Sequence, residues 1–175
     1  MLRDAIPVDH FSLPVIQAIG SRWMLLTAGT FAPGQFNCMT VSWGGLGVLW
    51  NKPMAMVVVR PSRHTFTFME AVDSFTLCLF PPQYRDALTL CGTRSGRSVD
   101  KVKETGLTPV ASTQVAPPTF DEAELVLECR KMYSADLDPN RFHADHIEAN
   151  YKGRDYHRMY MAEIVALFGT AAYRC

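Results

Sequence analysis

The sequence predicts a mainly β fold, an antiparallel barrel or sandwich with a few short helices. Two observations carry this prediction. Several short runs are rich in apolar, β-branched and aromatic residues, as strands are. Helix-like and strand-like segments also fail to alternate in the way that a parallel sheet requires. With 48% apolar and 19% charged residues, the 175-residue chain suits a single domain over residues 1–175.

The first half of the chain supplies most of the expected strands. Residues 1–20 are interrupted by Pro7 and Pro14 and are expected to form an N-terminal arm on the body. A glycine-rich stretch from Gly44 to Gly47 follows the second strand. The expected strands are 22–30, 36–43, 54–59 and 74–80, with a helix of about two turns over 65–72.

The second half begins with helical spacing over 84–91, which Gly92 is expected to end, and a further short helix over 98–105. Prolines then mark an exposed connection. Residues 140–175 are expected to be a C-terminal extension packed on the barrel or at a dimer interface, although 159–168 has strand composition. The remaining predicted features are the connection at Pro109, Pro117 and Pro118, and a strand within 122–136.

Charge and cysteine content exclude several classes of protein. Lys+Arg and Asp+Glu both number 17, so the chain lacks the basic excess of a nucleic-acid-binding protein. No apolar run reaches the roughly 18–20 residues of a membrane span, and the N-terminus has no signal-like apolar region. An odd number of cysteines without a CxxC pair predicts reduced thiols in a cytoplasmic protein. The low charged fraction also favours a surface covered by a second copy or a ligand.

The segment from Arg60 to Thr65 predicts an anion site. An apolar strand ends at Pro61, two arginines flank the turn, and Ser62 or Thr65 is placed to cap the following helix. A helix N-terminus beside two guanidinium groups suits an oxyanion, most simply a phosphate. The alternative is an ordinary turn with solvated arginines.

Two further segments have binding character. From Asn37 to Trp43, small polar side chains lie along a strand that leads into glycines, which suits a flat heteroaromatic ring; a plain strand and hairpin is the alternative. From Cys91 to Lys101, glycines, hydroxyls and cations can wrap a phosphate, although the order is not that of a P-loop. A solvated surface loop is the alternative there.

Taken together, the segments Asn37–Trp43, Arg60–Thr65 and Ser95–Lys101 resemble the flavin reductase-like, flavoredoxin-type FMN-binding proteins. The resemblance covers roughly residues 15–110. It implies a split β-barrel that forms a homodimer, holds FMN non-covalently near the subunit interface, and receives electrons from NAD(P)H or from a redox partner protein. Because the flavin carries the chemistry, no catalytic side chain is expected.

Carried over to this chain, the resemblance implies two groups of cofactor-binding residues. The first borders the ring and ribityl chain, and the second holds the phosphate. They are Asn37, Cys38, Met39, Thr40, Val41, Ser42 and Trp43, and then Arg60, Ser62, Arg63, Thr65, Ser95, Arg97 and Lys101.

Other interpretations remain open at this stage. His143, His146 and His157 lack a third and fourth ligand at a recognised spacing, so no metal is expected; they are expected to line the pocket mouth or the dimer surface. Glu122, Glu124 and Glu128 are expected on a solvated strand edge. The functional alternatives are an FMN-carrying electron-transfer protein without direct NAD(P)H oxidation, and a non-redox barrel that binds another phosphorylated ligand. NADH and NADPH are not distinguished.

Overall fold

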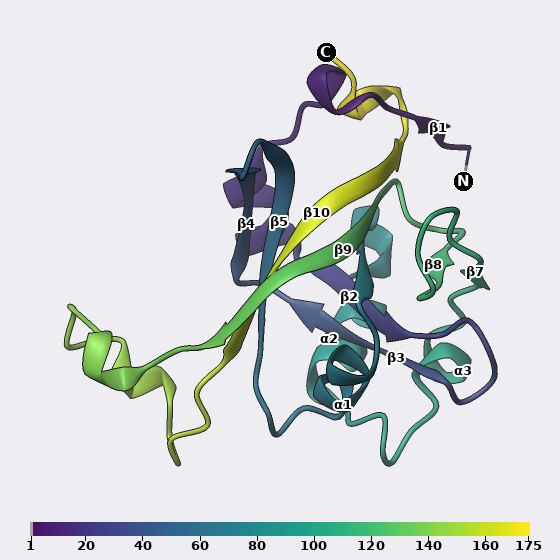
Figure 1. The fold of residues 1–175 in the computed structure, drawn as a ribbon. Helices are drawn as coiled ribbons and strands as arrows, with labels where there is room; N and C mark the ends of the chain where they lie inside the picture. The colour runs from purple at the N-terminus through teal and green to yellow at the C-terminus, as the bar shows by residue number, and fades with distance from the viewer. Residues whose placement is uncertain (1) are drawn as a thin grey trace.

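A computed structural model describes residues 2–175, and one antiparallel sheet dominates it (Figure 1). Along the sheet the strands follow the order β3-β2-β6-β9-β10-β5-β4, and β1 pairs with β10. Their bounds are β1 Asp4–Ala5, β2 Met24–Gly29, β3 Phe36–Val41, β4 Gly44–Leu49, β5 Lys52–Val59, β6 Ser74–Leu79, β9 Leu125–Asp136 and β10 Arg158–Gly169. A separate small hairpin joins β7 Pro109–Val110 to β8 Thr119–Phe120.

The predicted antiparallel, mainly β architecture is therefore confirmed. The strand predictions over 22–30, 36–43, 54–59, 74–80, 122–136 and 159–168 each match an observed strand to within a few residues. The glycine-rich stretch forms strand β4, and the hairpin turns beyond it at Trp50 and Asn51, which both have positive φ. Two successive residues with positive φ match the twist of a two-residue hairpin turn.

Strands β9 and β10 form the centre of the sheet and extend beyond it. At their far ends they carry residues 137–157, here called the projecting segment, which stands away from the body (Figure 1). Since β10 pairs with both β9 and β5, the expectation that 140–175 forms an extension is wrong for its second half. An apolar run with two strand neighbours is part of the core sheet.

The sheet buries apolar side chains on both faces because its strands alternate. One cluster contains Leu26, Val57 and Tyr160, and a second contains Leu25, Cys38 and Leu88. Leu25 and Leu26 are adjacent in β2 and point to opposite faces. Of the predicted N-terminal arm, residues 2–20 pack on the body through the buried side chains of Ile6, Ala18 and Ile19.

Short helices cover the sheet, and none among residues 2–175 is long and apolar enough to cross a membrane. Helix α2 continues through Gly92 to Thr93, so Gly92 does not end it as expected. The α-helices are α1 His64–Ala71, α2 Arg85–Thr93 and α3 Lys101–Thr105; Gln17–Arg22 is a π-helix, and the 3-10 turns are Val8–His10, Pro82–Tyr84, Pro139–Arg141, Glu148–Asn150 and Ala171–Tyr173.

The expected solvent exposure of the proline-marked connection and of Glu128 is wrong, and both have the same structural reason. Pro117 and Pro118 are buried, not exposed, because residues 111–118 fold over the sheet. Glu128 is 1% exposed under that connection. Its carboxylate accepts hydrogen bonds from the backbone N–H groups of Thr113, at 2.8 Å, and Gln114, at 2.6 Å. A buried carboxylate needs such donors, so Glu128 fixes the connection and is not a solvated edge residue.

Candidate functional site

Two chain segments that are distant in sequence meet in one hollow of about 300 Å³, here called the cationic hollow. One wall is the turn from Arg60 into the first residues of α1. The other is the loop that follows α2, together with the first residue of α3. The lining residues are Asn37, Met39, Arg60, Ser62, Arg63, His64, Thr65, Thr93, Arg94, Ser95, Gly96 and Lys101.

The first wall has the predicted strand-turn-helix form with different capping. Pro61 follows the end of β5, and Arg63 is the N-cap of α1, without a side-chain capping bond. Ser62 instead donates its hydroxyl to Asp155 of the projecting segment. Thr65 is buried and its Oγ1 accepts a hydrogen bond of 2.7 Å from Asn37 Nδ2, which ties the helix to β3.

The second wall approaches β3 so closely that only glycine fits. A Cβ atom at Gly96 would lie 2.1 Å from Asn37 Oδ1 and 3.2 Å from His64 Cδ2. The first distance is shorter than real Cβ contacts and would force the packed Asn37 side chain to move, and the second is tight. Gly96 therefore lets the second wall close against the first, which the sequence prediction had not assigned as a role.

Four cations in or beside the hollow bond to backbone carbonyl oxygens instead of carboxylates. Arg60 donates to Asn150 O at 2.8 Å and to Asp155 O at 3.3 Å. Arg63 donates to Gly92 O at 2.9 Å. Arg97, which lies beside the hollow, donates to Ser62 O at 3.2 Å, and Lys101 donates to Cys38 O and Cys91 O at 2.7 and 2.8 Å. Among residues 2–175, none of these four cations forms an ion pair.

Lys101 lies differently from the expectation that it closes over a bound group. Its side chain is buried, and both carbonyls that it bonds belong to β3 and α2. Burial lowers the pKa of Lys101, while the neighbouring Arg63 lowers it further. Lys101 thus supplies positive charge from beneath the hollow and holds its two supporting elements together.

Strand alternation divides the Asn37–Trp43 segment between two sides. Asn37 and Met39 line the cationic hollow. Cys38 lies against Cys91, and the Thr40 hydroxyl donates to Leu88 O, so both side chains contact α2. Val41 is buried in the core. The segment as a whole cannot present every side chain to one ligand, because successive residues of a strand point to opposite faces.

A second hollow of about 160 Å³, here called the β3-edge hollow, shares Met39, Arg60 and Arg63 with the first. Residues 40–43 and Val58 line it, and so does His157. The ring of His157 lies 5.2 Å from that of Trp43, and its Nδ1 is 3.0 Å from the Tyr151 hydroxyl.

An apolar cavity of about 810 Å³ also adjoins the cationic hollow, with which it shares Asn37, His64, Gly96 and Lys101.

His157 is a site residue that the sequence prediction had grouped with His143 and His146. The structure contains no cluster of metal-ligating side chains among residues 2–175, and His157 lies beside the arginines instead. Sequence alone could not indicate this position, because it follows from strand pairing: β10 pairs antiparallel with β5, with Arg158 opposite Val59, so the residues just outside the pair, His157 and Arg60, are neighbours.

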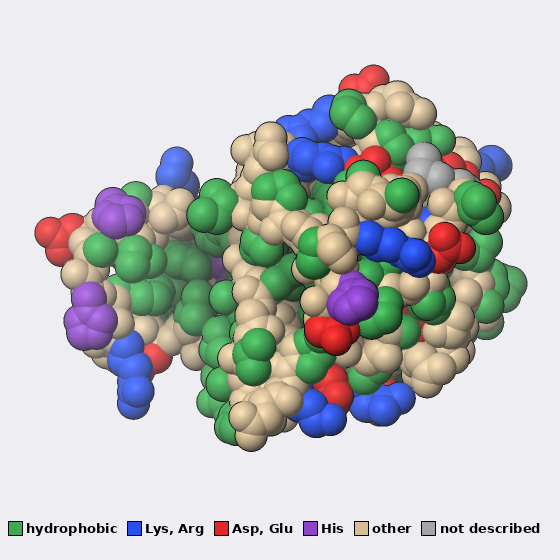
Figure 2. Space-filling view, turned by 90° about the horizontal axis from the view of Figure 1, so that it is seen from above, with side chains coloured by type: hydrophobic (Ala, Val, Ile, Leu, Met, Phe, Trp, Pro, Cys, Tyr) green, Lys and Arg blue, Asp and Glu red, His purple; other side chains and the backbone are tan. Residues whose placement is uncertain are grey.

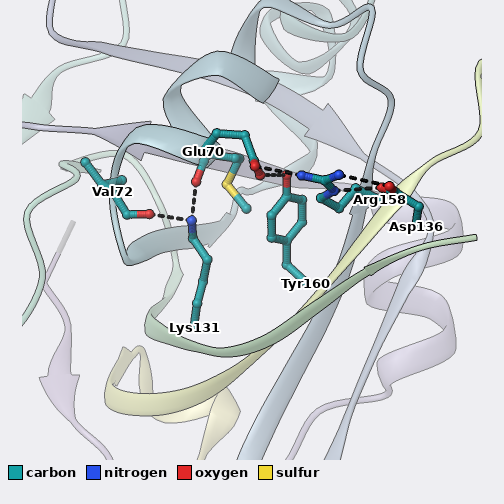
Figure 3. Close-up of polar contacts among 7 residues, drawn as sticks. Glu70, Val72, Lys131, Asp136, Arg158 and Tyr160 are labelled. Carbon is teal, nitrogen blue, oxygen red and sulfur yellow. Dashed lines mark hydrogen bonds and ion pairs between the residues drawn. The ribbon is translucent and has the colours of Figure 1, made fainter.

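Helix α1, which provides one wall, is anchored at its other end by a polar network (Figure 3). Glu70 accepts hydrogen bonds from Arg158, at 2.7 Å, and from the Tyr160 hydroxyl, at 2.6 Å. Arg158 also donates to both carboxylate oxygens of Asp136. Lys131 donates to the carbonyls of Met69 and Val72 at the end of the helix. Strands β9 and β10 thereby fix α1, and with it the position of Thr65.

The fold is an antiparallel split barrel, in which the start of helix α1 and the loop after α2 enclose the cationic hollow. The family model described as "Flavin reductase like domain" matches residues 16–170, and the chain belongs to that family. No curated protein sequence matches it significantly.

Solved structures share the fold at low identity. A flavoredoxin from Methanosarcina acetivorans has a TM-score of 0.68 at 23% identity, covering 97% of this chain and 76% of its own. A flavoredoxin of Desulfovibrio vulgaris (Miyazaki F) has a TM-score of 0.67 at 18% identity, with coverage of 93% and 73%. An FMN-binding domain of a flavin reductase-like enzyme from Shewanella baltica OS155 has a TM-score of 0.68 at 15% identity, with coverage of 96% and 77%. The split-barrel prediction is confirmed.

The surroundings of His157 predict a pH-dependent stability. Burial, reinforced by Arg60 and Arg63, lowers its pKa from 6.5 to about 4. The unfolded chain therefore binds more protons between these values, so the free energy of unfolding decreases as the pH falls from 6.5 towards 4, and is unaffected by this group above 6.5. We expect a loss of roughly 2 kcal/mol from His157, below the full linkage value because Asp155 and solvent screen the site.

Urea unfolding at pH 7 and pH 4.5 measures this effect, because His157→Gln removes the titrating group. The variant should lose less stability than the natural protein over that interval. His143→Gln, at an exposed position of the projecting segment, is the control and should behave like the natural protein. Equal losses in all three proteins would show that His157 titrates normally.

Proposed function

We propose that this protein binds FMN with the phosphate in the cationic hollow and acts as an oxidoreductase. The observation that carries the proposal is the group of four cations without carboxylate partners at the meeting point of two distant segments. Clustered cations repel one another, and a bound phosphate monoester, with a charge of about −1.5 to −2, removes that repulsion.

The side chains present fit a phosphate. The guanidinium groups of Arg60, Arg63 and Arg97 offer paired N–H donors, which match phosphate oxygens better than a point charge does. The hydroxyl groups of Ser62 and Ser95 lie on the two walls. Gly96 leaves the backbone open to close approach, as loops that bind phosphate require.

The β3-edge hollow is suited to one end of a flavin ring. Met39 and Trp43 offer apolar surface, and Ser42 and His157 offer polar groups. Because its pKa is about 4, His157 is neutral at physiological pH and keeps one ring nitrogen as a hydrogen-bond donor and one as an acceptor. When bound, the flavin supplies the hydride and electron chemistry, while the chain binds, orients and shields it.

We propose NAD(P)H as the reductant, so that the protein is a flavin reductase. The second candidate is an FMN-carrying electron-transfer protein, favoured by the likeness to two proteins named flavoredoxins. A non-redox barrel for another phosphorylated ligand is the third.

An anaerobic titration separates these functions. We expect FMN to bind at near one equivalent per chain, and NADH or NADPH to bleach the flavin absorbance at about 450 nm faster than it bleaches free FMN. Binding without faster bleaching would support the electron-transfer protein. Failure to bind FMN would contradict both flavin functions.

Replacing the arginines of the first wall tests the phosphate assignment. The double substitution Arg60→Ala and Arg63→Ala should weaken FMN on the order of 100-fold or more, since each lost charge-assisted hydrogen bond contributes about 1.5–3 kcal/mol. Riboflavin, which has no phosphate, should be affected far less. Dissociation constants from fluorescence quenching measure both.

The matched control is Arg141→Ala, because Arg141 is an exposed cation of the projecting segment outside the hollow. It should leave both affinities unchanged. Equal weakening of FMN and riboflavin by the double substitution would remove the assigned role of the two arginines.

We propose that the protein forms a homodimer through the outer surface of the β4–β5 hairpin and the adjoining end of β9. Val48, Trp50 and Tyr133 are 76%, 59% and 48% exposed there, and the rings of Trp50 and Tyr133 pack edge to face. Viewed from above, hydrophobic side chains also gather on the side of the projecting segment that faces the body (Figure 2). Large apolar side chains grouped on a surface indicate a covered interface.

Light scattering coupled to size-exclusion chromatography tests this interface. The natural protein should have the mass of two chains, and Trp50→Glu together with Tyr133→Glu should shift it to one. Leu2→Glu is the control, since Leu2 is 88% exposed and remote from the hairpin in sequence. A monomeric natural protein would contradict the proposal.

A further inference from the structure

Two buried thiols are in contact beneath the cationic hollow. The Sγ atoms of Cys38, on β3, and Cys91, on α2, are 3.8 Å apart. Both residues are buried, with exposures of 2% and 0%. Among residues 2–175 they are the only two thiols in hydrogen-bonding contact.

The charge around this pair distinguishes it from the other buried cysteines. Lys101 Nζ bonds to the carbonyl oxygens of both residues, which places a cation beside both sulfur atoms. The hydrogen bond from Cys38 and the charge of Lys101 lower the pKa of Cys91, while the same contact raises that of Cys38. By contrast, burial raises the pKa of Cys78 to about 12 and also raises that of Cys129.

We propose that Cys38 and Cys91 form a redox-active dithiol, which a hydroperoxide oxidises to an intramolecular disulfide between β3 and α2. The first thiolate attacks the peroxide oxygen, becomes a sulfenic acid and releases one molecule of water (or the alcohol of an organic hydroperoxide). The second sulfur then attacks the sulfenic sulfur, the S–S bond forms and water leaves. Two thiols and one hydrogen peroxide thus give one disulfide and two waters.

Access and geometry support this reaction. Cys38 lines the apolar cavity of about 810 Å³ and Cys91 does not, so Cys38 is the member of the pair that a molecule as small as hydrogen peroxide meets first. The sulfurs must approach from 3.8 Å to about 2.05 Å, a shift that the end of α2 can accommodate because it leads directly into a loop. The disulfide would link residues 53 positions apart and so restrict the unfolded chain.

Mass spectrometry of the purified chain after mild peroxide treatment tests the proposal. We expect a species lighter by two hydrogen atoms, and two of the five thiols should become unreactive towards a thiol reagent in denaturant. Proteolysis without reductant should yield one linked peptide pair containing Cys38 and Cys91. Dithiothreitol should reverse all three changes, and the oxidised form should melt at a higher temperature.

Substitution identifies the sulfurs. Cys38→Ser and Cys91→Ser should each abolish the mass loss, and the variant that keeps the attacking cysteine should leave a sulfenic acid that dimedone traps. Cys78→Ser, at a buried cysteine outside the pair, should retain the mass loss. Oxidation that only adds oxygen to the chain, or that only joins chains through the exposed Cys175, would overturn the proposal. Peptide mapping of the natural protein distinguishes these outcomes even if a variant does not fold.

Discussion

The site depends on a group of positively charged side chains that the fold leaves without carboxylate partners. Elsewhere several of the cations are paired with carboxylates: Arg22 with Glu124, and Arg158 with Glu70 and Asp136. In the cationic hollow the cations are held by carbonyl dipoles, which orient a side chain without cancelling its charge. This positive charge also lowers the pKa of the neighbouring histidines. Burial is the main cause that lowers the pKa of His64 and of His157, and nearby arginines lower both further, together with Lys101 at His64.

Such charge is useful only if the walls hold their positions, and the fold secures each wall separately. The first wall is fixed at the far end of α1, which is bonded to β9 and β10 through the Glu70–Arg158 network (Figure 3). The second is fixed from beneath, where Lys101 bridges β3 and α2. Asn37 joins the two, since its amide bonds to Thr65 and its oxygen allows only glycine at position 96. Preorganised donors lose little free energy when an anion binds, because the chain has already ordered them.

Sequence predicted the strands, and it indicated three segments whose residues the fold brings to one hollow, because each depends on local pattern: apolar runs for the strands, and clustered cations with Pro or Gly for the turns. It could not predict contacts that depend on strand order. Whether Glu128 is solvated depends on which residues cover β9, and whether His157 reaches the site depends on β10 pairing with β5. Lys101 was assigned to the right hollow by its charge, but its carbonyl partners follow from the packing of α2 on β3.

The equal numbers of acidic and basic residues do not indicate the cationic hollow, because the hollow also depends on which distant residues the fold brings together. A net charge of zero is a sum over the whole chain, whereas the field in a cavity depends on which charges are paired. If every Arg and Lys had a carboxylate neighbour, the same composition would give no anion site. The distribution of ion pairs therefore carries information that composition lacks. Only a few positions supply the cations of such a hollow, and the remaining positions need only form the barrel that brings these few together. Chains with 15–23% sequence identity to this one form the same fold.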